Sequence, residues 1–465
     1  MSKTLARVLA LSMALMLFAA ACSSSSDKKS DSTTTAAAAK IDYTKIGLWD
    51  DGACDTSKAP LKLGLMTVFQ SQIVSLEDQA KALEAAAKAF NSRGGANGSC
   101  IQVTTCDDGA NVDQAVACVK KIDDAGVVAT INDQGTAAQG EVAAAMRKAT
   151  IPRVAGNVTN NDWDDVNAYP IDASGTGVTF MMPQALIEMG VKKQAIARVD
   201  LPEASALIGL IGDLYKPQGV SFVLDSPVPA GTTDYSQFIL GAQNAGAGGM
   251  SMALGENEAT QIVKAGQQLN SDLKIGASLG TFPHSAVESY GNFAENMSFA
   301  GSFPPATYDL PVYEALRQDL AASGDDALQP ANLKTSPMRS WIGLYALLWM
   351  IRDQKVTDFT RANMTKMLQA ATDVPMLGIF GDESWTPNKT YKGLWQRIGT
   401  ATWGTYKWDS KASAPDGLKG NFVQTKTLNF AEILCGSLLG APKDTCTASG
   451  SGSGGSSTSS TTTSG

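Results

Sequence analysis

The first pattern that could bind a ligand is a run of small residues, Gly135-Thr136-Ala137-Ala138, which stands directly before a segment of helical spacing. Small residues let a ligand come close to the backbone, and the first N–H groups of a helix carry a positive partial charge that favours carboxylates. The pattern therefore indicates a site for a small carboxylate. A plain turn between a strand and a helix has the same composition and is the alternative.

Two more loops follow predicted strands in the same way, Thr67 to Ser75 and Asn157 to Trp163. Open parallel sheets bind ligands outside the carboxyl ends of their strands, where such loops meet. Thr136 and Thr159 are therefore expected to face one crevice. Two threonine hydroxyls beside a helix N-terminus are suited to hold a carboxylate.

Catalytic patterns are weaker than this binding pattern. The sequence has no P-loop and no strand-linked GxGxxG. The stretch Gly249 to Ala253 (GMSMA) is one residue short of a nucleophile elbow, and its apolar neighbours favour an ordinary strand serine. A Ser–His pair would have to use His284, the single histidine. The sequence therefore predicts a protein that is not an enzyme and needs no cofactor.

Metal sites are also disfavoured by residue spacing. The acidic stretch from Asn160 to Asp165 does not have the spacing of an EF-hand loop, so a solvated loop is expected there. Zinc is disfavoured because the cysteines lack a CxxC pair and His284 stands alone.

Strands and helices alternate regularly in the first part of the chain. An apolar strand is expected at Leu61 to Thr67, and Ser75, with Asp78 three residues on, is expected to cap the helix that follows. Further strands are predicted at 100–105, 127–132 and 152–157, with helices at 112–122 and 139–148. Because these strands are apolar on both faces, they predict a parallel sheet buried between two helix layers.

A second unit of the same kind begins at residue 194. Its predicted strands are 194–200, 220–228, 249–255, 274–280 and 297–303. The apolar helix around Trp341 comes too late for this series and is expected to return to the first lobe. The alternating stretch Thr402 to Trp408 is expected to complete the second lobe. The predicted fold class is α/β, with two Rossmann-like lobes, parallel central sheets and a hinge of several crossovers.

The two ends of the chain are rich in Ser, Thr, Gly and Ala and cannot bury a core. The expected parts are a signal peptide with its lipidation site (1–22), a tether with an N-terminal extension (23–57), lobe one (58–175), lobe two (176–303), a return to lobe one (304–395), the completion of lobe two with a C-terminal extension (396–447) and a disordered tail (448–465).

The N-terminus resembles a lipoprotein leader. Lys3 and Arg7 precede the apolar run from Val8 to Ala21. As a helix this run rises only about 21 Å, less than a hydrocarbon core of roughly 30 Å. The sequence AAAC that ends at Cys22 resembles the bacterial lipobox, although the pattern prefers Leu at its first position, so ordinary secretion is the alternative. We expect an extracytoplasmic protein that Cys22 anchors to the cell membrane through a lipid.

The charge of the chain limits its partners. A net charge of −8 and a pI near 4.9 argue against nucleic acid and anionic lipid. No other apolar run in the sequence reaches membrane-spanning length.

Six cysteines remain besides Cys22, and an even number in an exported chain predicts disulfides. They could pair in fifteen ways. Neighbouring pairs are favoured, because Cys54 precedes the first strand and Cys100 opens the second, at the same edge of a parallel sheet. The expected pairs are Cys54–Cys100, Cys106–Cys118 and Cys435–Cys446.

Several segments, in this order, resemble the branched-chain amino-acid type of periplasmic binding protein, a type I fold that serves ABC transporters. They are KLGLMT (62–67), CDDGANVDQAVACVKKI (106–122), VVATIN (127–132), GTAAQ (135–139) and IPRVAGNVTN (151–160). The likeness spans roughly residues 58–410 and is firmest over 60–200.

That resemblance implies roles for individual residues. Thr136, after Gly135, would hold the ligand carboxylate through its hydroxyl and backbone. The loop Asn157-Val158-Thr159 would supply a backbone carbonyl and the threonine hydroxyl, and Phe69 would cover the ligand. The family also has a cysteine pair after its second strand, a place that Cys106 and Cys118 occupy here.

The second lobe departs from the family pattern. Leu201-Pro202-Glu203 stands where the family's amino-acid binders carry a tyrosine, and no acidic residue lies near Gly280-Thr281 to hold an ammonium. Glu256 could take that role, although an acidic residue in a first helical turn is often a dipole cap.

The expected function is the capture of a small solute by a monomer that delivers it to an ABC transporter permease. The solute would be an amino acid or a related small carboxylate or amide. A ligand sensor of the same fold that feeds a signalling partner is one alternative, and a hydrolase is the other.

Overall fold

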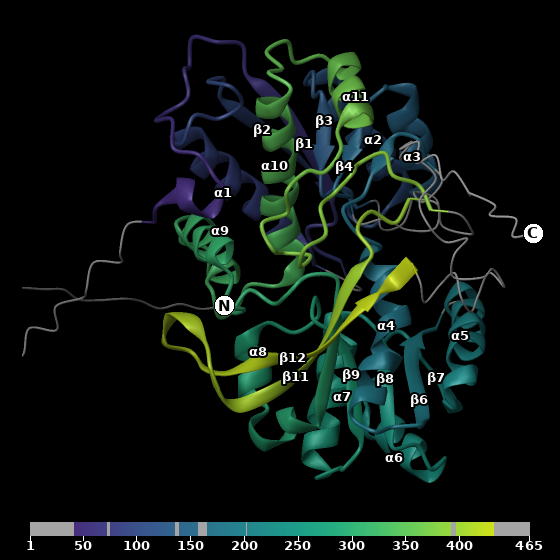
Figure 1. Ribbon diagram of the computed structural model, residues 1–465. Coiled ribbons are helices and arrows are strands. Elements are labelled where there is room, and N and C mark those ends of the chain that lie inside the picture. The colour runs from purple at the N-terminus through teal and green to yellow at the C-terminus, as the bar shows by residue number, and fades with distance from the viewer. Residues whose placement is uncertain are drawn as a thin grey trace, which may run out of the picture. The chain divides into compact units, whose positions relative to one another are not determined.

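The computed structural model describes residues 41–71, 75–134, 139–156, 165–200, 202–391 and 397–431. They form two sheets with helices packed against them (Figure 1), which confirms the predicted α/β fold. Within these ranges no helix is both long and apolar enough to span a bilayer.

The first sheet has five parallel strands in the order β2-β1-β3-β4-β5. The strands are β1 (Leu61–Thr67), β2 (Ile101–Asp107), β3 (Ala129–Ile131), β4 (Arg153–Val154) and β5 (Ala168–Tyr169). The helices beside them are α1 (Glu77–Ser92), α2 (Val112–Asp124), α3 (Gln139–Lys148), α9 (Pro311–Ala321), α10 (Thr335–Asp353) and α11 (Arg361–Ala370).

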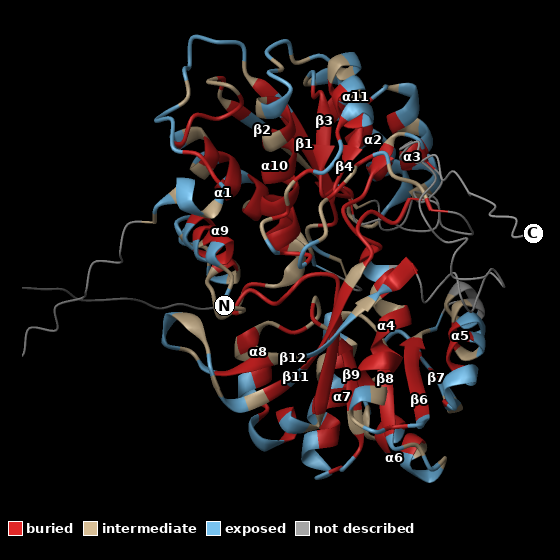
Figure 2. Ribbon diagram, viewed as in Figure 1, coloured by how far each residue is buried: buried red, intermediate tan, exposed pale blue. Residues whose placement is uncertain are grey.

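Alternation along β1 shows how this sheet is buried on both faces. Successive side chains of a strand point to opposite faces. Leu63 and Leu65 therefore join the core formed with α1 and α10, whereas Met66 joins the core formed with α2 and α3. Figure 2 shows β1, β3 and β4 buried, whereas β2 at the edge of the sheet is mostly half-buried and the outer surfaces of α2 and α3 are exposed.

The second sheet has seven strands in the order β12-β11-β10-β9-β8-β6-β7. The strands are β6 (Lys193–Val199), β7 (Ser221–Val228), β8 (Gly249–Ala253), β9 (Lys274–Ser278), β10 (Met297–Gly301), β11 (Thr402–Ser413) and β12 (Lys419–Asn429). The helices are α4 (Ser174–Glu188), α5 (Pro202–Tyr215), α6 (Ser236–Asn244), α7 (Glu256–Gln268) and α8 (His284–Ser289). Strands β6 to β10 are parallel, and β11 and β12 continue the sheet antiparallel.

Within its described part the chain passes between the two sheets three times, after β5, after β10 and before β11. The first and third passages lie side by side, because Asp172 and Thr400 form a parallel bridge. Ser302, on the second passage, donates its hydroxyl hydrogen bond to the Asp172 carboxylate. The three passages therefore meet at Asp172.

Helix α10 packs against α1 beside the first sheet. The rings of Phe90 on α1 and Trp341 on α10 have centroids 5.3 Å apart, and both side chains are fully buried. The apolar helix around Trp341 thus contributes to the core of the first sheet, although it comes after all the parallel strands of the second.

The start of α1 differs from the expectation. The helix begins at Glu77, and Leu76, in the N-cap position, makes no side-chain cap. The prediction of Ser75 as the cap is wrong, because its hydroxyl instead donates to the Phe69 carbonyl at 2.7 Å and closes the loop after β1. Asp78, the expected second half of a capping box, pairs with Lys334.

Two disulfides lie at the two ends of β2. Cys54 is bonded to Cys100, directly before the strand, and Cys106, near its end, is bonded to Cys118 on α2. These are two of the three pairs expected from the sequence. The third, Cys435–Cys446, lies outside the described residues.

Candidate functional site

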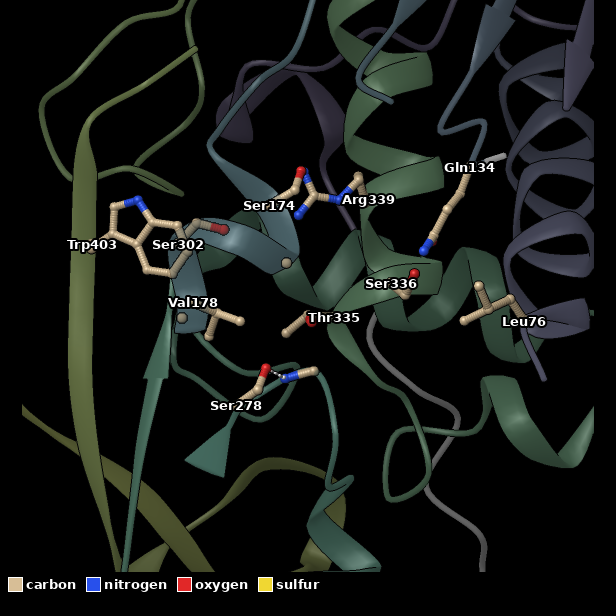
Figure 3. A pocket seen from close by; sticks show the side chains of 13 residues that line it. Leu76, Gln134, Ser174, Val178, Ser278, Ser302, Thr335, Ser336, Arg339 and Trp403 are labelled. Carbon is tan, nitrogen blue, oxygen red and sulfur yellow. Dashed lines mark hydrogen bonds between the residues drawn. The ribbon is translucent and has the colours of Figure 1, made fainter. Parts of the chain in front are cut away.

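A cavity of about 180 Å³ lies where the strands of both sheets end (Figure 3). Gln134 reaches it after β3, Ser278 from the end of β9 and Ser302 after β10. Trp403 on β11 forms an apolar wall, and its side chain is 1% exposed. This is the edge at which open parallel sheets bind ligands.

The N-terminal ends of three long helices contribute to this cavity. Leu76 stands at the start of α1, Ser174 and Gly175 at the start of α4, and Thr335 and Ser336 at the start of α10. In the described structure, no cap side chain accepts a hydrogen bond at any of these three starts. The aligned peptide dipoles of the three helices, together with the first-turn N–H groups of α1 and α10, make the cavity favourable for an anion.

Most of the polar side chains around the cavity are hydroxyls. Ser278 accepts a hydrogen bond from the Gly280 N–H at 3.0 Å, and Ser336 accepts one from the Gln79 side chain. Asn132, whose φ of 53° lies in the left-handed region, donates to the Ser336 carbonyl at 2.9 Å. The turn after β3 is therefore fixed to the start of α10.

Arg339 is the only charged side chain among the described residues that line the cavity. Its guanidinium donates to both oxygens of Asp172, with 3.0 Å between Nη2 and Oδ2. Asp172 is fully buried and also accepts hydrogen bonds from Ser302 and from the backbone and hydroxyl of Ser174.

The charge state of Asp172 follows from these contacts. Burial by itself would raise its pKa, but the charge of Arg339 and the hydrogen bonds from Arg339, Ser302 and Ser174 lower the pKa below its ordinary value. A guanidinium has five N–H donors, and the contacts with Asp172 account for two. Arg339 thus fixes the crossover segments and keeps donors that a ligand carboxylate can use.

Glu256 lies beside this cavity rather than in its described lining. It begins α7 as expected, and its carboxylate pairs with Lys334 Nζ at 3.0 Å. The same ammonium pairs with Asp78 on α1 at 3.0 Å. Burial raises the pKa of Asp78 in spite of Lys334. Burial would lower the pKa of Lys334, yet the two carboxylates raise it. Glu256 was expected to hold a ligand ammonium, but in the structure its carboxylate pairs with the ammonium of Lys334 instead.

Phe69 also lies away from the described lining of the cavity. Its half-buried ring packs against the core of the first sheet, and its N–H donates to Asp107 Oδ1 at 2.9 Å. The other expected ligand residues lie outside the described residues: Gly135, Thr136, Asn157, Val158 and Thr159. Gln134, directly before this first group, does line the cavity. Cys22 is also outside the described residues.

Sequence reasoning missed Ser174, Ser302 and Arg339. The two serines lie where the chain leaves one sheet for the other, a place that no local pattern marks. Arg339 had a weak signal, because it is a charged residue at the start of the apolar segment that forms α10.

Comparisons with known proteins agree with this geometry. A family model described as periplasmic binding protein matches residues 60–401. A search of curated proteins finds no match to the chain.

Several solved structures share the fold at low sequence identity. A solute-binding protein of an ABC transporter from R. palustris, in complex with 4-hydroxybenzoate, has a TM-score of 0.64 and 16% identity, over 80% of this chain and 97% of that one. The leucine-, isoleucine-, valine-, threonine- and alanine-binding protein from Brucella ovis has a TM-score of 0.62 and 15% identity, over 80% and 96%. A fatty acid ABC transporter substrate-binding protein from Thermomonospora curvata has a TM-score of 0.62 and 15% identity, over 82% and 95%.

Proposed function

Because the chain belongs to the periplasmic binding protein family, we propose that it captures a small extracytoplasmic solute and delivers it to an ABC transporter permease. Proteins of this family bind their solute without transforming it, so the chain is not an enzyme. The lipobox-like sequence at Cys22 supports attachment to the outer face of the cell membrane, close to the permease.

The observation that carries this proposal is the convergence of three helix N-termini on one cavity at the carboxyl ends of both sheets. The helix N-termini, Arg339 and the hydroxyls of Ser278, Thr335 and Ser336 are suited to a carboxylate or an amide oxygen. The hydroxyls of Ser174 and Ser302 donate to Asp172 instead. The described lining has no Asp or Glu. The site therefore recognises the acid or amide end of its solute rather than an ammonium group.

Proteins of similar fold guide the choice of candidate solutes. They include binders of amino acids, 4-hydroxybenzoate and fatty acids. We propose a small monocarboxylate or amide, including amino acids, as the class to be screened.

A thermal-shift screen of the mature protein tests this function. The screen uses amino acids, primary amides, short carboxylic acids and aromatic acids. A ligand at a hundredfold its Kd adds about 2.7 kcal/mol to the free energy of unfolding, which gives a clear shift. An absence of any shift with these solutes, for protein that is folded and oxidised, would refute the proposed function.

A further inference from the structure

A second cavity of about 320 Å³ adjoins the first. The two share the lining residues Gly175, Val178 and Ser278, so they are direct neighbours. Figure 3 shows Val178 and Ser278 on the side of the first cavity that belongs to α4 and the end of β9. The second cavity continues from there between α4, α5 and the ends of β6 and β8.

The lining of this second cavity differs in chemistry from that of the first. It is mainly aliphatic or thioether, and its polar side chains are hydroxyls without charge. The larger apolar side chains include Val178, Met182, Leu207, Ile208, Met252 and Leu254. Among the described residues that line it there is no Asp, Glu, Lys or Arg.

This second cavity is a recess that opens to solvent. Met182 and Ile208, with 1% and 8% exposure, form part of its buried apolar wall. A small number of polar anchors beside a larger apolar compartment is the usual composition of a ligand pocket.

On the basis of the proposed function, we propose that the substrate is a monocarboxylic acid with an uncharged apolar body, aliphatic or aromatic. Its carboxylate lies in the first cavity, at the helix N-termini beside Arg339. Its apolar body extends past Val178 into the second cavity between α4 and α5. The class thus excludes small polar amino acids as preferred substrates.

Calorimetric affinities for a series of unbranched acids test this assignment on the wild-type protein. Acetate, butanoate, hexanoate and octanoate are compared, with hexanamide as the uncharged match of hexanoate. Burial of each methylene should tighten binding about fourfold, which corresponds to about 0.8 kcal/mol. Hexanoate should bind more tightly than hexanamide.

A pair of variants on α5 locates the apolar body. Ala204 lines the second cavity, and Ser205, the next residue, is exposed. Ala204→Trp should fill the cavity and weaken octanoate at least about tenfold, while butanoate changes less. Ser205→Trp, on the outer surface of the same helix, should leave both affinities unchanged.

The outcomes separate the two proposals. If no solute of either screen binds, the proposed function itself is refuted. If glycine or alanine binds most tightly and affinity is flat along the acid series, the protein is a solute receptor but the apolar compartment is refuted. Equal octanoate affinity in Ala204→Trp and Ser205→Trp also refutes the placement of the apolar body in the second cavity. Tighter binding of hexanamide than of hexanoate refutes recognition of a carboxylate. The wild-type series decides the question even if Ala204→Trp does not fold.

Discussion

Replacement of Asp172 by Asn should reveal how strongly the three passages between the sheets depend on one buried charge. The substitution keeps the shape of the side chain but leaves Arg339, whose side chain is 8% exposed, without its counter-ion. Removing one partner of a buried ion pair costs about 3–5 kcal/mol. We expect the free energy of unfolding to fall by that amount at pH 7, as measured by urea denaturation.

The stability difference between wild type and Asp172→Asn should depend on pH in a definite direction. The pKa of Asp172 is lowered in the folded protein, so its stabilising contribution is complete above the unfolded pKa of about 3.9. As the pH falls through that value towards the lower folded pKa, the contribution is lost, because protonation of the carboxylate removes the charge pair. The difference between wild type and Asp172→Asn should therefore be constant above about pH 5 and shrink in more acidic buffer.

Two comparisons control this experiment. Asp124→Asn removes an exposed ion pair with Lys120, 2.6 Å between Nζ and Oδ2, and should have little effect. The double change Asp172→Leu, Arg339→Met removes both buried charges and should recover most of the loss. A small effect of Asp172→Asn at pH 7, or one that grows on acidification, would refute the charged pair as the element that joins the passages.

Three further predictions concern location and binding. Cys22→Ser should release the protein from membranes into the medium, and unchanged membrane partitioning would contradict lipidation. Thr136→Val combined with Thr159→Val should weaken a carboxylate ligand by two orders of magnitude or more, since charge-assisted hydrogen bonds contribute about 1.5–3 kcal/mol each. Thr357→Val, at an exposed site, is the control for this double variant. If the double variant binds the ligand as tightly as the wild type does, the ligand lies elsewhere. We also expect the lobes to close over the ligand, so small-angle scattering should show a smaller radius of gyration with ligand, and a constant radius would indicate a rigid binder.

Local patterns were sufficient to predict most strands but not all elements. The strand at Leu61–Thr67 agrees with its predicted bounds because a continuous apolar run is typical of a doubly buried parallel strand. Helix α4 was missed because glycines at its start and Pro183 inside it obscure the helical pattern. Strand β12 was missed because its outer half is polar and pairs only with β11.

The candidate site could be predicted only in part, for a different reason. The position of the loops follows from the rule that parallel sheets bind at their carboxyl ends, and Gln134 in the cavity agrees with it. The contacts of Asp172 with Ser302 and Arg339 join residues 130 and 167 positions apart. Such contacts depend on how the passages meet in space, and no local pattern contains that information.

The position of the two disulfides has a consequence for the order of folding and export. Both bracket β2, which lies at the end of its sheet and pairs with β1 alone. In the chain-entropy account, closing rings of 12 and 46 residues adds about 3 to 4 kcal/mol each. Neither disulfide forms in the reducing cytosol. The edge of the first sheet therefore gains this stability only after the chain has crossed the membrane. Before export the chain lacks both disulfides, which helps it to remain unfolded while it is translocated.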